Sequence, residues 1–93
     1  MIELHTGEYA EADTPEAEAR AFGRIATALG YAYKQGLVVN AGHGLNYHNT
    51  ERVASLPGIN ELNIGHAIVA RALFVGLKEA VRDMRGILDR AGR

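Results

Sequence analysis

Three short stretches of the chain have the hydrophobic pattern of β-strands, and each leads into a stretch with helical spacing. Apolar and polar residues alternate over residues 2–5 and again over 61–64, while 37–41 is a mostly apolar run rich in β-branched side chains. A glycine follows closely behind each stretch. We therefore expect three short strands, each ending in a tight turn.

Helix signals follow each of these strands. Pro15 stands at an expected first helical position behind residues that can cap a helix, and Gly36 provides a stop after apolar residues spaced by three and four. After the second strand, Asn49 can cap a short helix that must end at a Pro-Gly pair. After the third strand we expect a short helix over 67–74 and a longer amphipathic helix from Leu77 onward, packed on the sheet.

This alternation of strands and helices predicts an α/β fold whose parallel strands are joined by right-handed crossovers. The spacing of the expected strands brackets the roughly 30 residues per unit of a (β/α)8 TIM barrel of about 250 residues. No linker or low-complexity tract interrupts the chain. Residues 1–93 are therefore interpreted as a single segment that contains about three βα units of a TIM barrel.

Composition and charge narrow the function classes. Ten Lys and Arg residues against eleven Asp and Glu give a net charge of −1, without the basic stripe that a nucleic-acid backbone requires. The absence of cysteine excludes thiol chemistry and suits a reducing cytoplasm. Neither a secretory signal nor an apolar stretch of the roughly 18–20 residues that span a bilayer is visible. We expect a cytoplasmic chain that binds neither nucleic acid nor membrane.

Polar side chains occur where buried parallel strands are usually apolar. Glu3 and His5 lie on the same face of the first expected strand, and Glu61 and Asn63 on the same face of the third. The second strand adds Asn40. Buried polar groups need hydrogen-bond partners. These residues either line a polar cavity inside a barrel, which their joint position favours, or form a satisfied internal hydrogen-bond network.

Two of the expected strands end in a Gly-His turn, at the strand ends where barrel enzymes place their active sites. His43 lies between two glycines and is the best acid–base candidate, because imidazole groups exchange protons readily near neutral pH. Gly65 and His66 precede a short helix whose free N–H groups could hold a phosphate. Gly44, in the neighbouring turn, strengthens that interpretation.

The other histidines fit structural roles better. His5 is expected to orient a neighbouring group in the cavity, and His48 to lie in a loop or at a helix start. No pair of histidines has the i, i+4 spacing of a helical zinc motif, although His43 and His48 could approach each other around a loop. A metal site is therefore not expected.

The sequence around these turns closely resembles the pyridoxine 5'-phosphate synthase family. Three segments carry the resemblance: residues 2–7 (IELHTG), 39–49 (VNAGHGLNYHN) and 61–68 (ELNIGHAI). The resemblance covers essentially the whole chain, and the two longer segments together are far more specific than Gly-His pairs alone.

The resemblance implies a (β/α)8 transferase of vitamin B6 biosynthesis, which condenses 3-amino-2-oxopropyl phosphate with 1-deoxy-D-xylulose 5-phosphate and releases phosphate and water. By motif position, His43 matches the family's proton donor, and Glu3 matches a carboxylate that stabilises the transition state. Gly44, Gly65 and His66 match contacts to the aminooxopropyl phosphate. No cofactor is implied, and the family assembles as homo-oligomers, to which residues 77–93 could contribute contacts.

The chain departs from the family pattern in what it lacks. Its strands correspond to strands six to eight of the barrel, so the first five are missing, together with the family's two general bases, a histidine and a glutamate. A domain of this size buries little more than about 60% of its unfolded surface. We therefore expect the isolated chain to be inactive and to need the remaining barrel strands or self-association. The alternative is a phosphate-binding or assembly module without catalysis.

Overall fold

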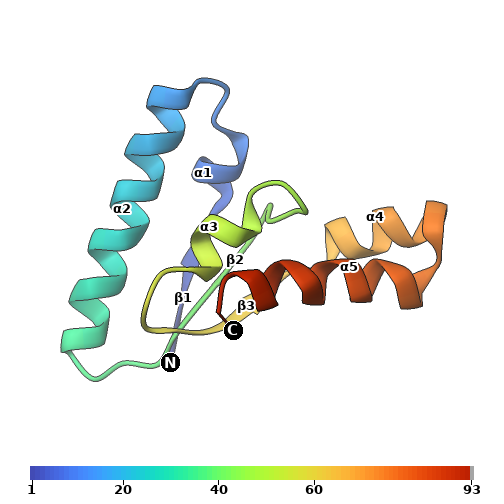
Figure 1. Ribbon diagram of the computed structural model, residues 1–93. Coiled ribbons are helices and arrows are strands. Elements are labelled where there is room, and N and C mark those ends of the chain that lie inside the picture. The colour runs from blue at the N-terminus through green and yellow to red at the C-terminus, as the bar shows by residue number, and fades with distance from the viewer. Residues whose placement is uncertain (93) are drawn as a thin grey trace.

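The computed structural model describes residues 1–92, so Arg93, the last residue of the predicted segment, lies outside the described residues. Within them, strands alternate with single helices or pairs of helices (Figure 1). In chain order the elements are β1 (Ile2–His5), α1 (Gly7–Glu11), α2 (Pro15–Lys34), β2 (Val39–Gly42), α3 (Thr50–Ala54), β3 (Ile59–Asn63), α4 (His66–Val75) and α5 (Leu77–Arg90).

The strands form one parallel sheet in the order β1-β2-β3, which confirms the predicted α/β class. β1 and β2 are in register from Ile2 opposite Val39 to His5 opposite Gly42. Between β2 and β3 the register shifts after Val39, so that Asn60 is the extra residue of a bulge. Parallel neighbours connected through helices are the arrangement that βαβ units produce.

α2 is the long helix that packs against β1 and β2, and it begins where the sequence predicts. The side-chain oxygen of Thr14 accepts a hydrogen bond from the N–H of Ala17 at 3.1 Å, and Pro15 occupies the first helical position. The helix buries one apolar stripe, which consists of Ala21, Ile25, Leu29 and Ala32. This stripe joins Val39, Ala41 and Ile59 of the strands in the main hydrophobic core.

The second and third strands begin at other residues than predicted. β2 begins at Val39 rather than Leu37, because the N–H of Leu37 still donates to a carbonyl in the last turn of α2, at 3.2 Å. β3 begins at Ile59 rather than Glu61 and ends at Asn63, since Ile59 is already buried in the core. The apolar connector after α2 therefore has the composition of a strand but lies outside β2, and the carbonyl of Val38 accepts a hydrogen bond from the N–H of Ile2 at 2.9 Å.

A short helix that the sequence did not predict, α1, directly follows β1. The pattern indicated only a turn at Thr6 and Gly7, because a helix of 5 residues is too short to show helical spacing. Tyr9 anchors this helix: its side chain is 3% exposed and its hydroxyl donates to the carbonyl of Asn49 at 2.8 Å. α1 is thereby attached to the loop that follows β2.

Asn49 occupies the N-cap position of α3, as predicted, but its side chain does not cap the helix. Its Oδ1 instead accepts from the N–H of Asn46 at 2.7 Å, and its Nδ2 donates to the carbonyl of Gly44 at 3.3 Å. The carboxamide therefore closes the loop before the helix, a use that Asn side chains often have in turns.

α4 and α5 extend to one side of the sheet (Figure 1). Gly76, with a φ of 89°, separates them near the predicted break. α5 buries Ala80, Met84 and Ile87. The sequence analysis expected this helix to pack on the sheet, but it packs mainly on α4 and α3. α4 buries none of its residues, so this pair of helices presents apolar side chains on its surface.

Candidate active site

The turns after β2 and β3 border one cavity of about 490 Å³. Four of the five predicted site residues line it: His43, Gly44, Gly65 and His66. The remaining lining residues are Leu45, Asn46, Asn63, Ile64 and Ala67. The two Gly-His turns, separated in the sequence by an intervening helix, therefore lie at the same edge of the sheet.

Glu3, the fifth predicted residue, lies beside this cavity rather than in its wall. It is on β1 and is exposed. Its carboxylate accepts a hydrogen bond from the Nδ2 of Asn63, which does line the cavity. Through this hydrogen bond, Glu3 is linked to the cavity that His43 lines.

The polar strand residues share one face of the sheet. In the register of the sheet, Glu3, Asn40 and Glu61 lie side by side. His5 and Asn63 lie at the next level, separated by Gly42. Of these five residues only Asn63 lines the cavity, while hydrogen bonds join Asn63 to Glu3 and Asn60 Nδ2 to Asn40 Oδ1, the latter at 3.2 Å.

Glycine at position 42 lets β2 and β3 approach each other closely. A Cβ at Gly42 would lie 2.8 Å from the Cβ of Asn63 and 3.0 Å from its carbonyl oxygen. A side chain there would push the third strand away. The close approach brings the turn that carries His43 near the end of β3.

His43 has an unusual backbone and a ring partner. Its φ is 93°, a region that residues with a Cβ rarely adopt. Its exposed imidazole stacks on that of His5, with ring centroids 4.1 Å apart and planes inclined by 27°. The carbonyl of His43 accepts a hydrogen bond of 2.6 Å from the hydroxyl of Thr6. The imidazole is therefore oriented from both its ring and its backbone.

Gly44 continues this left-handed turn with a φ of 77°. A Cβ at this position would lie 2.7 Å from the Cβ of Ala10 in α1. Both the backbone conformation and the close approach of α1 thus require glycine here. The unpredicted helix α1 is one reason why the turn has this shape.

Gly65 and His66 stand at the start of α4. His66 is the first helical residue and Gly65 the N-cap, with no side-chain cap. The first N–H groups of any helix have no acceptor within the helix and carry partial positive charge. Among residues 1–92, no atom outside the chain neighbours of Gly65 lies within 4 Å of the position that its Cβ would take. Packing among the described residues therefore does not require glycine at this position, and the open space leaves the backbone accessible.

Tyr47 fastens the loop after β2 to the other helices, a role that sequence reasoning missed. Its hydroxyl donates to the carbonyl of Ala80 in α5 at 2.7 Å, and the guanidinium of Arg71 lies 5.1 Å from its ring centroid. Burial raises the pKa of Tyr47 above its ordinary value, while Arg71 lowers it and Asp83 raises it further. The only signal of this contact in the sequence was the presence of an aromatic residue, Tyr47, within the 39–49 segment.

His48 lies in the same loop, as expected, and does not line the cavity. Its N–H donates to the Oδ1 of Asn46 at 2.8 Å. The same oxygen accepts from the N–H of Asn49 at 3.1 Å. His48 therefore contributes its backbone to the loop, while its side chain is exposed.

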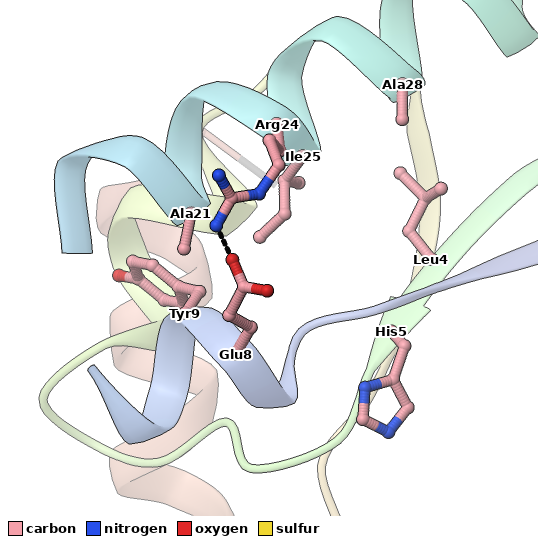
Figure 2. Close-up of a pocket in the computed structure, with 8 residues that line it drawn as sticks. All are labelled: Leu4, His5, Glu8, Tyr9, Ala21, Arg24, Ile25 and Ala28. Atoms are coloured by element: carbon pink, nitrogen blue, oxygen red, sulfur yellow. Dashed lines mark ion pairs between the residues drawn. The ribbon is translucent and has the colours of Figure 1, made fainter. Parts of the chain in front are cut away.

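A smaller hollow of about 150 Å³ lies between β1, α1 and α2 (Figure 2). Glu8 and Arg24 face each other there and form an ion pair (Figure 2). Most of the other lining residues are apolar, among them Leu4, Ala21 and Ile25. Because its two charged groups pair with each other, this hollow offers no converging set of reactive groups comparable to the larger cavity.

Two kinds of feature are absent from the part of the chain that the structure describes. Over residues 1–92, no group of three or more His, Cys, Asp or Glu side chains is placed to hold a metal ion. None of the described helices combines the length and the apolar character needed to cross a membrane.

Comparison with known proteins agrees with the sequence resemblance. Residues 1–90 match the family model described as "Pyridoxal phosphate biosynthesis protein PdxJ". The chain is 59% identical over 88 residues to pyridoxine 5'-phosphate synthase of Alcanivorax borkumensis and 58% identical over 91 residues to that of Idiomarina loihiensis. These alignments cover 95% and 98% of the chain but only 36% and 38% of the two relatives. The chain therefore belongs to the PdxJ family of pyridoxal phosphate biosynthesis proteins.

Proposed function

We propose that the chain forms strands six to eight of a pyridoxine 5'-phosphate synthase TIM barrel. In the complete barrel it would take part in condensing 3-amino-2-oxopropyl phosphate with 1-deoxy-D-xylulose 5-phosphate, without a cofactor. The observation that carries this proposal is the shared cavity of His43, Gly44, Gly65 and His66. It lies at the carboxyl ends of parallel strands, where TIM-barrel enzymes bind and convert their substrates.

In this proposal, His43 donates a proton to a leaving oxygen. Its exposed imidazole borders the cavity and is held by stacking on His5. Glu3 supplies a negative charge that stabilises positive charge developing in the transition state. Its hydrogen bond from Asn63 fixes that carboxylate near the cavity.

The phosphate of the aminooxopropyl substrate binds at the start of α4. Free N–H groups at a helix N-terminus are ordinary phosphate ligands, and the space at Gly65 permits close approach to the backbone. Gly44 and His66 line the same cavity. The site thus combines an anion-binding wall with an adjacent acid.

The remaining barrel strands are the partner that the proposal requires. β1 pairs only with β2 within the described sheet, and β3 likewise pairs only with β2, so the two outer strands each have an open edge. Closure of the barrel would cover both edges and supply the missing bases. We propose that the complete protein works in the cytoplasm as a homo-oligomer.

The test compares the purified 93-residue chain with a completed protein. The completed protein joins this chain to the part of the Alcanivorax borkumensis relative that the chain does not match. We expect pyridoxine 5'-phosphate from the completed protein and none from the chain alone. Substituting Asn for His43 should reduce turnover by about 10²- to 10⁴-fold, the range for losing proton transfer. Strong product formation by the chain alone would contradict the proposal.

The second candidate is a phosphate-binding module without catalysis. It is favoured by one observation, that the Gly44, Gly65 and His66 wall lies entirely within the chain. Titration of the isolated chain with glycerol 3-phosphate, followed by NMR, should shift the signals of these residues if binding needs no other strands. Absence of shifts would remove this candidate without affecting the complete enzyme.

A further inference from the structure

We propose that Thr6 is a positioning residue for His43, setting the direction of the imidazole through two hydrogen bonds to backbone carbonyls. Thr6 follows β1 and is completely buried, so it does not border the substrate cavity. It reaches His43 across 37 positions of sequence. The inference rests on the proposed function, because it assigns Thr6 a purpose in the reaction that His43 would serve.

The backbone of His43 needs an external support. Among residues 1–92, it is the one non-glycine residue with a positive φ. A conformation in which the Cβ crowds the backbone persists only where surrounding structure determines it. The two neighbours of His43 are glycines, which impose no conformation of their own. The support must therefore come from outside the turn.

Thr6 supplies that support at two points. Its backbone N–H donates to the carbonyl of Gly42 at 2.9 Å, and its hydroxyl donates to the carbonyl of His43 at 2.6 Å. These carbonyls belong to the peptide groups immediately before and after the Cα of His43. Holding both planes restricts both backbone dihedral angles of His43, and with them the direction of its Cα–Cβ bond.

The residues on either side of Thr6 act on the ring. The imidazole of His5 stacks on that of His43, and its Nδ1 accepts a hydrogen bond from the N–H of Gly7 at 3.3 Å. A Cβ at Gly7 would lie 2.6 Å from His5 Cε1 and 2.8 Å from His43 Cδ2. Glycine at position 7 thus leaves the room in which the two rings stack.

Thr50 shows what a merely structural threonine looks like in the same molecule. It is equally buried, and its hydroxyl donates to the carbonyl of Asn46, also at 2.6 Å. That bond joins residues four positions apart at the start of α3. Thr50 therefore provides a matched control in burial and bond length that touches neither imidazole of the stacked pair.

The first measurement is NMR of the full chain with labelled histidines, comparing Thr6→Val, Thr6→Ser and Thr50→Val. Stacking gives the His43 ring protons a ring-current shift that depends on the position of His5. We expect T6V to move these signals, T6S to leave them near the wild-type positions, and T50V to leave them unchanged despite losing a comparable hydrogen bond. Should T6V fail to fold, Thr6→Ala, which removes the hydroxyl without adding a methyl group in its place, must move the same signals.

The second measurement is steady-state kinetics of the completed protein. T6V should lower kcat on the order of 10- to 100-fold, as expected for slight misplacement of a reacting group, with KM nearly unchanged and recovery in T6S. Unchanged ring signals in T6V or in T6A, or an equal loss of kcat in T50V, would overturn the inference. If the wild-type completed protein makes no product, the proposed function fails, while the ring signals still decide whether Thr6 positions His43.

Discussion

The two sides of the candidate cavity belong to regions that bury their apolar residues differently. The region of β1, β2 and α2 encloses its core, and Leu29 is only 3% exposed. The α4–α5 pair projects beside the sheet and leaves Leu73 81% and Phe74 89% exposed (Figure 1). An exposed apolar surface of this kind is typical of a contact with another chain segment or subunit.

This difference divides the candidate site. His43 and Gly44 belong to the turn after β2, which the core, α1 and Thr6 hold in place. Gly65 and His66 belong to the start of α4, which has no buried residue. The proposed acid, His43, is therefore positioned by contacts within the chain, whereas the proposed phosphate contacts at Gly65 and His66 depend on a helix whose apolar side has few partners within the described residues.

The largest expected effect is on the free energy of unfolding, and it is tested by replacing one leucine with alanine in each region. Leu29→Ala should lower the free energy of unfolding by about 2–5 kcal/mol, since it removes buried methyl groups and leaves a cavity. Leu73→Ala should change it by no more than about 0.5 kcal/mol, because the side chain is already in water. Urea denaturation of both variants checks this, and an equal loss for L73A would show that α4 is packed in solution.

Self-association should depend on the α4–α5 pair, which we call the open region because it leaves apolar side chains exposed. Phe74→Ser should weaken association of the chain by about 10- to 100-fold, corresponding to roughly 1.5–3 kcal/mol for burying one large apolar side chain. Light scattering over a concentration series measures this. The matched control is Tyr31→Ser in α2, which removes an aromatic ring that is 70% exposed. Equal effects of both substitutions would contradict a contact specific to α4.

Gly44 and Gly65 are expected to be glycine for different reasons, the first for its backbone conformation and the second for the approach of a ligand. Gly44→Ala should cost roughly 1–2 kcal/mol of stability for the left-handed conformation, with a further cost from the contact with Ala10. Gly65→Ala should cost less than about 0.5 kcal/mol, since open space surrounds its Cβ position. In the completed protein, however, G65A should raise KM for the aminooxopropyl phosphate. Thermal unfolding together with kinetics distinguishes the two effects, and an unchanged KM in G65A would contradict the phosphate role.

Much of this arrangement could be predicted from the sequence. The strand-and-helix order and the start of α2 follow from periodicity and capping residues, which are local signals. The cavity residues could be named because a Gly-His turn after a parallel strand places its side chains at the same edge of the sheet. Glu3 could be placed on the polar strand face, but its hydrogen bond to Asn63 depends on strand register.

The parts that escaped prediction depend on contacts between distant segments. α1 is too short for periodicity, and it is held by Tyr9 through a bond to the loop after β2. The support of His43 by Thr6 joins residues with no common motif. Leu37 has strand composition, yet the hydrogen bond of its N–H to α2 excludes it from β2. Local patterns carry no information about such partners.

The smallest expected effect concerns the two tyrosines that fasten the loop after β2. Burial raises the pKa of Tyr9, as does the Glu18 carboxylate, while Arg52 opposes them. Tyr47 likewise has a raised pKa, chiefly through burial. A pKa that is higher in the folded than in the unfolded state means that the folded state retains its proton longer. The resulting stabilisation is complete below the ordinary value near 10 and is lost as pH rises through the folded-state pKa.

Tyr9→Phe should therefore act in two ways. It removes the hydrogen bond to the Asn49 carbonyl, at a cost of about 1 kcal/mol at neutral pH, and it reduces the loss of stability above pH 10. Tyr47→Phe should cost a similar amount through its bond to Ala80, which ties the loop to α5 in the open region. Urea denaturation at pH 7 and in alkaline buffer measures both effects. Because Tyr9 anchors the loop to the core and Tyr47 anchors it to the α4–α5 pair, a negligible cost for Y47F alone would show that the open region does not hold the loop.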